Sequence, residues 1–198
     1  SDITVFSFHP VKIITTGEGG AITTNNVEIS KRIKLLRSHG ITRDRNEFLN
    51  KDEGSWYYEQ HNLGFNYRLT DIQAALGLSQ VKRSLNFVSK RREIAKRYDE
   101  LLSNMPIITP KQELYSLSSW HLYVIRIEES TTKMSHYEAF NTLREKKIWV
   151  NLHYIPIHLQ PFYQKMGFKK GDFPKAEQYY KQAISLPIFF SLTNKEQD

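Results

Sequence analysis

The chain has 198 residues, of which 39% are hydrophobic, 13% aromatic and 25% charged, a composition typical of globular proteins and sufficient for a core in one or two domains. The absence of cysteine excludes disulfides, a thiolate nucleophile and cysteine-based zinc sites. The formal net charge is +7, and no apolar run approaches the ~18 residues that a membrane span needs, so no membrane partner is expected.

Both ends of the sequence have features of a piece cut from a longer protein. The chain begins at Ser1 without an initiator methionine and enters an apolar stretch almost at once. At the other end, Thr193 and Glu196 have the spacing of a capping box, which opens a helix, yet the chain stops two residues later. We therefore expect a longer full-length protein.

Basic residues gather at positions 31–34, 82–83 and 90–97. Two interpretations are open: a nucleic-acid footprint and a set of solvated helix faces. The second is favoured because each cluster lies on a predicted helix with its own apolar stripe. We expect no nucleic-acid partner, although an anionic small substrate would be attracted by the same charges.

The first predicted elements are strands. A short buried strand is expected at 3–6, and a hairpin at 11–16 and 21–24 around the glycine-rich turn 17–20. A helix is predicted after Asn26, because the apolar residues that follow recur at spacings of four and three. It is expected to end near Gly40.

A long polar stretch and two further helices follow. Residues 41–60 lack any periodicity, and stretches of this length are usually functional or mobile. Thr70 and Gln73 have capping-box spacing before a second helix. A third helix covers 87–102, and the composition changes after it. The sequence therefore predicts a domain boundary between 104 and 105.

Strand and helix patterns alternate in residues 105–198. Strands are predicted at 121–127 and 149–154, and helices at 135–146 and from Pro174 through Ala183. Such alternation is typical of a small α/β domain.

Lys12 lies in the segment with the strongest chemical signal. It stands among Val11, Ile13 and Ile14, where a charged ammonium is costly to bury without a partner or a chemical task. Desolvation would make the amine a nucleophile that forms a Schiff base with a carbonyl. Ser7, five residues earlier, could donate its hydroxyl to a phosphate. The alternative is a lysine that extends into solvent from an edge strand.

Residues 6–20 resemble the cofactor-lysine segment of the DegT/DnrJ/StrS sugar aminotransferases, in which Ser-Phe-His-x-x-Lys precedes a Thr-x-Glu-Gly-Gly-like hairpin. The resemblance extends in the same order through residues 36–40, 66–69 and 153–156. It implies an α/β fold in which residues 1–104 are part of an aspartate-aminotransferase-like (fold type I) large domain that binds pyridoxal 5'-phosphate. Residues 105–198 would be a small C-terminal α/β domain, truncated at its end, so that the chain is the second half of the protein.

The resemblance also implies a role for each candidate residue. Lys12 is expected to be catalytic and to bind the cofactor, together with Ser7. Asn66 is expected to reach the cofactor phosphate of the neighbouring subunit, and Arg68 the diphosphate of a nucleotide-sugar substrate. These roles imply a homodimer with shared active sites. For Asn66 and Arg68, the alternative is a turn and an ordinary surface arginine.

His153 and Tyr154 are expected to face the substrate across the same interface. His153 and His158 are five residues apart, a spacing that does not place both on one helix face, and no carboxylate is close in sequence. No metal site is therefore expected. The alternative is a strand histidine that only satisfies a backbone carbonyl.

The resemblance implies an aminotransferase that moves an amino group from an amino acid, glutamate by analogy, to a nucleotide-linked keto sugar. Residues 36–44 and 61–68 most resemble the branch that aminates carbon 4 of a UDP-linked 6-deoxy-keto-hexosamine for pseudaminic acid, in bacterial surface or flagellar glycan synthesis. A cytoplasmic location is expected, since the N-terminus lacks signal-peptide features. The rivals are a dehydratase of the same fold, which carries His in place of the lysine, and a non-catalytic module that binds nucleotide sugars or nucleic acid.

Overall fold

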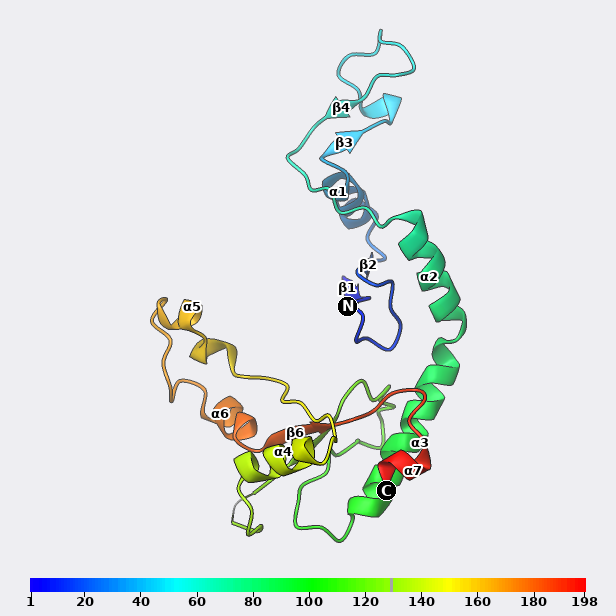
Figure 1. Cartoon of the computed structure of the whole chain (residues 1–198). Coiled ribbons are helices and arrows are strands. Elements are labelled where there is room, and N and C mark those ends of the chain that lie inside the picture. Colours follow the sequence, from blue (N-terminus) through cyan, green and yellow to red (C-terminus); the bar gives the residue numbers. More distant parts are fainter. Residues whose placement is uncertain (129) are drawn as a thin grey trace. The chain divides into compact units, whose positions relative to one another are not determined.

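The computed structural model describes residues 1–128 and 130–198 (Figure 1). They form two compact units, residues 1–84 and residues 85–198, and each is described by itself. None of the helices within the described ranges is long and apolar enough to cross a membrane.

The first unit begins with a two-stranded antiparallel sheet. Strand β1 (Thr4–Ser7) pairs with β2 (Gly20–Thr23), so that Val5 lies opposite Ile22 and Ser7 opposite Gly20. The predicted strand at 3–6 is confirmed, but its predicted burial is wrong, because Val5 is 72% exposed.

The predicted strand at 11–16 is also wrong, since these residues belong to the loop that joins β1 to β2. Within this loop Thr16 donates its backbone N–H to the Phe8 carbonyl at 3.1 Å, and Lys12 donates its own to the His9 carbonyl at 2.9 Å. The loop therefore satisfies its backbone internally instead of pairing with residues 21–24. Pro10, which has no N–H to donate, also disfavours a ladder here.

Helices α1 and α2 have the N-termini that the sequence predicts. The Asn26 side chain accepts from two backbone N–H groups at the start of α1 (Val27–Arg37). Thr70 and Gln73 form a complete capping box at the start of α2 (Asp71–Lys82). Residues 41–60 are mostly irregular, as expected. Their only regular elements are β3 (Ile41–Thr42), the 3-10 turn η1 (Arg45–Glu47) and β4 (Glu59–Gln60), and β3 pairs with β4 in antiparallel fashion.

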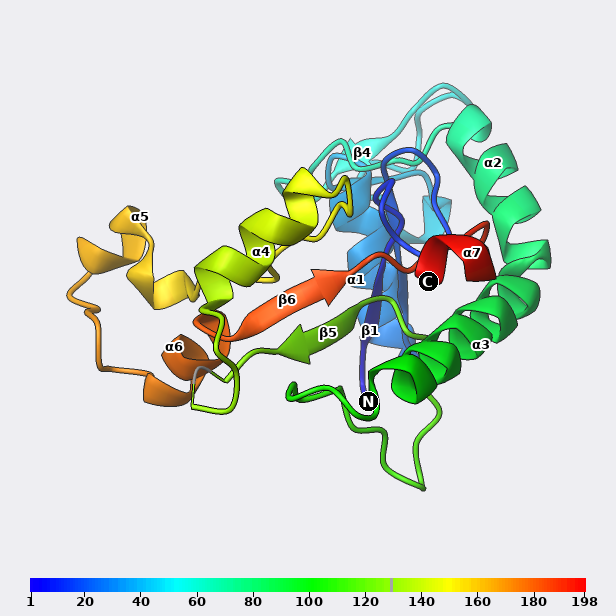
Figure 2. The same cartoon turned by 60° about the horizontal axis from the view of Figure 1, so that its bottom comes forward.

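The second unit is built on α3 (Ser84–Leu102) and on a second antiparallel pair, β5 (Tyr123–Arg126) with β6 (Ala183–Leu186). Helix α4 (His136–Glu145), capped by Ser135, lies beside β6 in Figure 2. The remaining elements are short: the 3-10 turn η2 (Ile157–Leu159), α5 (Pro161–Gln164), α6 (Pro174–Tyr180) and α7 (Asn194–Gln197).

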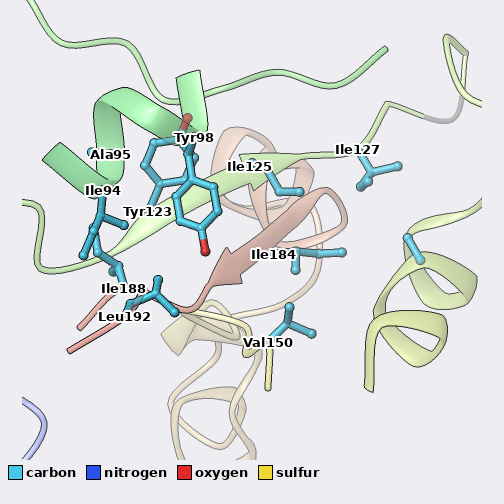
Figure 3. Packing of buried hydrophobic residues seen from close by; sticks show 11 residues of the cluster. Ile94, Ala95, Tyr98, Tyr123, Ile125, Ile127, Val150, Ile184, Ile188 and Leu192 are labelled. Carbon is cyan, nitrogen blue, oxygen red and sulfur yellow. The ribbon is translucent and has the colours of Figure 1, made fainter. Parts of the chain in front are cut away.

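The main hydrophobic core lies in this second unit. Ile94 and Tyr98 of α3 pack with Tyr123 and Ile125 of β5 and with Ile184 of β6 (Figure 3). The boundary between these two compact units falls at 84/85, because α3 contributes one side of this core. The division at 104/105 between a large cofactor-binding domain and a small domain stays a prediction.

Two predictions for the second unit are wrong. Residues 149–154 do not form a strand, and only Asn151 makes an isolated bridge, to Ser185. The strand lies at 183–186, where the predicted helix was to end. Helix α6 already stops at Tyr180, and the short apolar run after it is buried by pairing with β5. Periodicity alone does not distinguish such a run from the end of a helix.

Candidate active site

The loop between β1 and β2 holds Lys12 in a conformation fixed by short-range hydrogen bonds. Thr16 is buried and donates its hydroxyl to the Glu18 carbonyl at 2.7 Å. Thr15 donates its hydroxyl to the Phe8 carbonyl at 3.0 Å, and Phe8 donates its N–H to the Gly19 carbonyl at 2.8 Å. The loop is therefore closed at its base and braced across its middle.

Helix α2 supports this loop from outside. Gln73 donates its side-chain amide to the Glu18 carbonyl at 2.9 Å, while the amide oxygen of the same side chain accepts from the backbone N–H of Thr70 at 3.0 Å. A Cβ at Gly77 would lie 2.8 Å from the Thr16 methyl group, so the glycine permits close packing at this point. The start of α2 and the Lys12 loop are thus coupled.

The Lys12 side chain is partly buried. In the part of the chain that the structure describes, its ammonium has no carboxylate within the 4.0 Å of an ion pair. The carboxylate of Glu18, in the same loop, lies 3.7 Å from His9 Nε2. No carboxylate therefore holds this side chain in an ion pair, and the free amine form of a lysine is the one that condenses with a carbonyl.

Ser7 ends β1 at the entrance to the same loop, and its hydroxyl oxygen accepts weakly from the His9 N–H at 3.5 Å. The hydroxyl can still donate its own proton. An amine and a hydroxyl donor on one braced loop suit a ligand that carries an aldehyde and a phosphate, which is the chemistry of pyridoxal phosphate. Lys12 and Ser7 remain predicted cofactor residues on this basis.

Asn66 and Arg68 lie on a segment that crosses the end of α1. Phe65 donates its N–H to the Leu36 carbonyl at 2.6 Å, and Tyr67 donates its N–H to the Arg37 carbonyl at 3.0 Å. Both Asn66 and Arg68 are exposed and precede the capped start of α2, as the sequence predicts.

Two glycines make this crossing possible. Gly40 has a φ of +72°, and a Cβ there would meet the Asn62 carbonyl. A Cβ on Gly64 would lie 2.8 Å from the Leu36 carbonyl oxygen. Because glycine has no side chain at either position, the two backbones can approach closely. This approach fixes the position of the segment that carries Asn66 and Arg68.

Arg68 and the β1–β2 sheet share a cavity of 1050 Å³. Phe6, Gly19, Gly20 and Tyr67 are among its lining residues, but Lys12 is not. The structure thus brings Arg68 to the glycine-rich end of the loop without placing it against the lysine.

His153 and Tyr154 belong to the second unit, next to β6. His153 Nδ1 lies 2.7 Å from the hydroxyl of Ser185, which is itself buried. The ring of Tyr154 meets that of His153 edge-on at 4.6 Å, and Tyr154 is 68% exposed. The hydroxyl of Ser185 on β6 thus helps to orient the ring of His153.

Two polar clusters were missed at the sequence level. The first surrounds Glu59, which is buried and accepts from the backbone N–H groups of Leu49 and Asn50 at 2.9 and 2.8 Å, with His61 Nε2 at 2.7 Å. Burial alone would raise the pKa of Glu59, but these donors and Tyr57 lower it to about 2. The alternation of Tyr57, Glu59 and His61, which places three polar side chains on one side of an extended segment, was the available signal.

The second cluster joins His158 to Glu177. His158 Nε2 lies 3.0 Å from a Glu177 oxygen that also accepts from the Gly171 N–H at 2.6 Å. The hydrogen bond from His158, followed by that from Gly171, lowers the pKa of Glu177. The carboxylate partner is 19 residues away in sequence, so the residues adjacent to His158 do not indicate it. The described residues contain no group of three or more His, Asp and Glu side chains arranged to hold a metal ion.

Two proteins of known sequence are similar to almost the whole of this chain. A protein of Methanocaldococcus jannaschii without an assigned function is 45% identical over 197 residues, covering 98% of this chain and 51% of the relative. The UDP-4-amino-4,6-dideoxy-N-acetyl-beta-L-altrosamine transaminase of Campylobacter jejuni is 38% identical over 197 residues, covering 99% of this chain and 50% of the transaminase.

A solved structure has the same fold. Helicobacter pylori PseC, an aminotransferase involved in the biosynthesis of pseudoaminic acid, superimposes with a TM-score of 0.86 at 35% identity, over 99% of this chain and 50% of PseC. The chain therefore spans about half the length of these relatives. The sequence pattern of one family matches residues 1–198, and this chain belongs to that family, the DegT/DnrJ/EryC1/StrS aminotransferases.

Proposed function

We propose that the full-length protein is a pyridoxal-phosphate-dependent aminotransferase that moves an amino group from glutamate to a UDP-linked 4-keto-6-deoxy sugar. Membership of the aminotransferase family and the name of the Campylobacter jejuni relative support this proposal. The observation that carries it is Lys12, an amine without a carboxylate partner among the described residues, on a loop braced by hydrogen bonds and by α2. The product would enter surface or flagellar glycan synthesis.

Lys12 has two roles in this proposal. Pyridoxal phosphate, when bound, supplies the carbonyl that condenses with amines and the ring that delocalises electrons. The Nζ atom of Lys12 would hold the cofactor through its aldehyde. When it is free, the same Nζ would act as general base and general acid toward the substrate. The Ser7 hydroxyl donates to the cofactor phosphate.

Four exposed or partly exposed residues complete the site from the neighbouring subunit. Asn66 donates its amide to the cofactor phosphate, and Arg68 pairs with the substrate diphosphate, for which a guanidinium is well suited. His153 and Tyr154 face the nucleotide part of the substrate. Since the chain spans about half of its relatives, the rest of the protein supplies the carboxylate for the ring nitrogen and the aromatic residue that stacks on the ring.

The direct test uses the purified full-length protein with glutamate and a UDP-linked 4-keto-6-deoxy-N-acetylhexosamine. We expect an amino sugar by mass spectrometry, and at least a 1000-fold loss of turnover in Lys12→Ala, because the variant lacks the only group proposed to transfer the proton. Lys169→Ala is the control, since Lys169 is exposed in the second unit. Undiminished turnover in Lys12→Ala would contradict the proposal, and a product that has lost water without gaining nitrogen would favour the dehydratase.

Shared active sites are tested by mixing subunits. Lys12→Ala and Asn66→Ala homodimers should both be inactive or nearly so, while mixed dimers should regain activity in the one site that receives neither substitution. The measurement is turnover after co-expression with two affinity tags that isolate the heterodimer. If pure heterodimers stay inactive, Lys12 and Asn66 serve the same site within one chain.

A further inference from the structure

The C-terminal half of α1 and the turn after it form the wall of a strongly basic cavity of 1270 Å³. We name it the basic cavity. Its lining contains six cationic side chains and two carboxylates. The cations are Lys31, Arg32, Lys34, Arg37, Arg43 and Arg68, and the carboxylates are Glu28 and Glu47.

Both carboxylates are already engaged. Glu28 lies 3.5 Å from the ammonium of Lys31, and Glu47 accepts from the hydroxyl of Thr42 at 2.7 Å. Across residues 1–128 and 130–198, the other five cations have no carboxylate within 4.0 Å. A group of like charges that face one hollow repel one another, and this repulsion is relieved when a polyanion binds.

The helix dipole explains only part of this arrangement. Lys34 and Arg37 are in the last turn of α1, where cations are favoured in any helix. Arg43 and Arg68 come from elsewhere. Arg43 lies over the ring of Tyr58, with 5.3 Å from its guanidinium carbon to the ring centre, and Arg68 is delivered by the backbone crossing at Gly40 and Gly64. Convergence of cations from three segments indicates a binding site and not only a capped helix end.

We propose that the basic cavity binds the two phosphate groups of the nucleotide-linked substrate, with Lys34, Arg37 and Arg43 acting beside Arg68. This inference rests on the proposed function, which requires a diphosphate ligand. Guanidinium groups bind phosphate oxygens in pairs, and a lysine adds a compact point charge. The volume exceeds the several hundred Å³ typical of sites for small molecules, so a nucleoside attached to the diphosphate has room.

The test is titration calorimetry on the full-length enzyme with UDP, inorganic diphosphate and uridine at two salt concentrations. We expect the double variant Lys34→Gln/Arg37→Gln to bind UDP and diphosphate at least tenfold more weakly than the wild type, with little change for uridine. Lys169→Gln/Lys170→Gln is the matched control, since it removes the same charge from exposed positions in the second unit and should change each affinity less than twofold. The visible absorption of bound pyridoxal phosphate should be the same in all three proteins.

Several results would overturn the inference. Equal losses in the double variant and the control would mean a general charge effect, and unchanged UDP affinity would mean that the cavity does not hold the diphosphate. Tighter, steeply salt-dependent binding of single-stranded DNA that is lost in the same variant would assign the cavity to nucleic acid. If the double variant does not fold, Arg43→Gln should still weaken UDP binding severalfold, and no loss there would reject the site. A protein that binds UDP as expected but does not transfer an amino group would refute only the proposed function.

Discussion

Glu59 is the one carboxylate around which residues 48–61 are arranged. Four donors converge on it, two from the backbone and two from the side chains of Tyr57 and His61. This segment has little hydrophobic core, so the hydrogen bonds to Glu59 hold it together in place of apolar packing. Removing the carboxylate leaves several buried or partly buried donors without an acceptor. Local order in this segment should therefore depend on pH.

The sign of this dependence follows from the pKa. The folded value of about 2 lies below the usual 4.5, so the charged carboxylate stabilises the fold above pH 4.5, and this contribution is lost as the pH falls from about 4.5 towards 2. We expect Glu59→Gln to lower the melting temperature at pH 7 and to show a weaker pH dependence in that window. Glu53→Gln, at an exposed position, is the control. Parallel melting curves against pH for the two variants would contradict the assignment.

Replacing a glycine can cost stability through backbone strain or through a steric clash, and Gly40 and Gly17 allow the two costs to be measured apart. Both have positive φ, +72° and +81° respectively, but a Cβ meets the Asn62 carbonyl only at Gly40, while at Gly17 nothing lies within 4 Å. Gly17→Ala should cost about 1–2 kcal/mol of unfolding free energy from backbone strain alone. Gly40→Ala should cost about 3 kcal/mol or more, since the clash adds to the strain. Urea denaturation of the full-length variants measures both, and equal costs would mean that the crossing relaxes easily.

At the scale of elements, the cap of α2 matters for the Lys12 loop as well as for the helix. Thr70→Ala removes the acceptor for the Gln73 N–H at 3.3 Å and should cost about 1 kcal/mol. Because Gln73 also donates to the Glu18 carbonyl, hydrogen exchange in residues 15–19 should accelerate in this variant. Ser79→Ala, inside the same helix, is the control and should leave this exchange unchanged. Exchange in the loop that is unaffected by Thr70→Ala would show that the cap and the loop are independent.

Most helix starts were predictable, whereas the predicted strands at 11–16 and 149–154 are wrong and β6 was missed, for a physical reason. Four helices begin at a residue that caps them through a local side-chain hydrogen bond: Asn26, Thr70, Ser135 and Thr193. Because these bonds join residues close in sequence, the sequence alone predicts them. The identity of a strand such as β6 depends on its partner, which lies some 60 residues away in β5. The apolar run at 11–16 favours a strand, but in the structure these residues form a loop.

The site residues divide in the same way. Their local settings, such as the position of Asn66 and Arg68 before a capped helix, followed from neighbouring residues. The basic cavity did not, because it needs Arg68 to meet α1 through a backbone crossing between segments almost 30 residues apart. The partners of Glu177 and His153 were likewise set by tertiary contacts.

At the scale of the whole molecule, the β1–β2 sheet exposes apolar side chains that a stable protein covers. Val5 and Ile22, which face each other across the pair, are 72% and 46% exposed, and the chain spans about half of its relatives. We expect the 198-residue chain expressed alone to self-associate, since unpaired strands with apolar faces recruit further strands.

Sedimentation velocity checks this expectation. Val5→Thr/Ile22→Thr should reduce the associated fraction, whereas Leu114→Thr, which removes an exposed leucine from an irregular segment of the second unit, should not. A monodisperse 198-residue chain, or equal effects of the two changes, would mean that the sheet does not drive association. By the same account the chain alone should not transaminate, because the proposed partner of the ring nitrogen lies in the rest of the protein.

The central claim is that Lys12 carries the cofactor, and chemical trapping tests it most directly. The full-length protein is treated with pyridoxal phosphate, then with borohydride, which converts the reversible bond between amine and cofactor into a permanent one, and the peptides are mapped by mass spectrometry. The account predicts one modified peptide, with the cofactor on Lys12, and none in Lys12→Arg. Modification of another lysine in the native protein, or no modification at all, would contradict it.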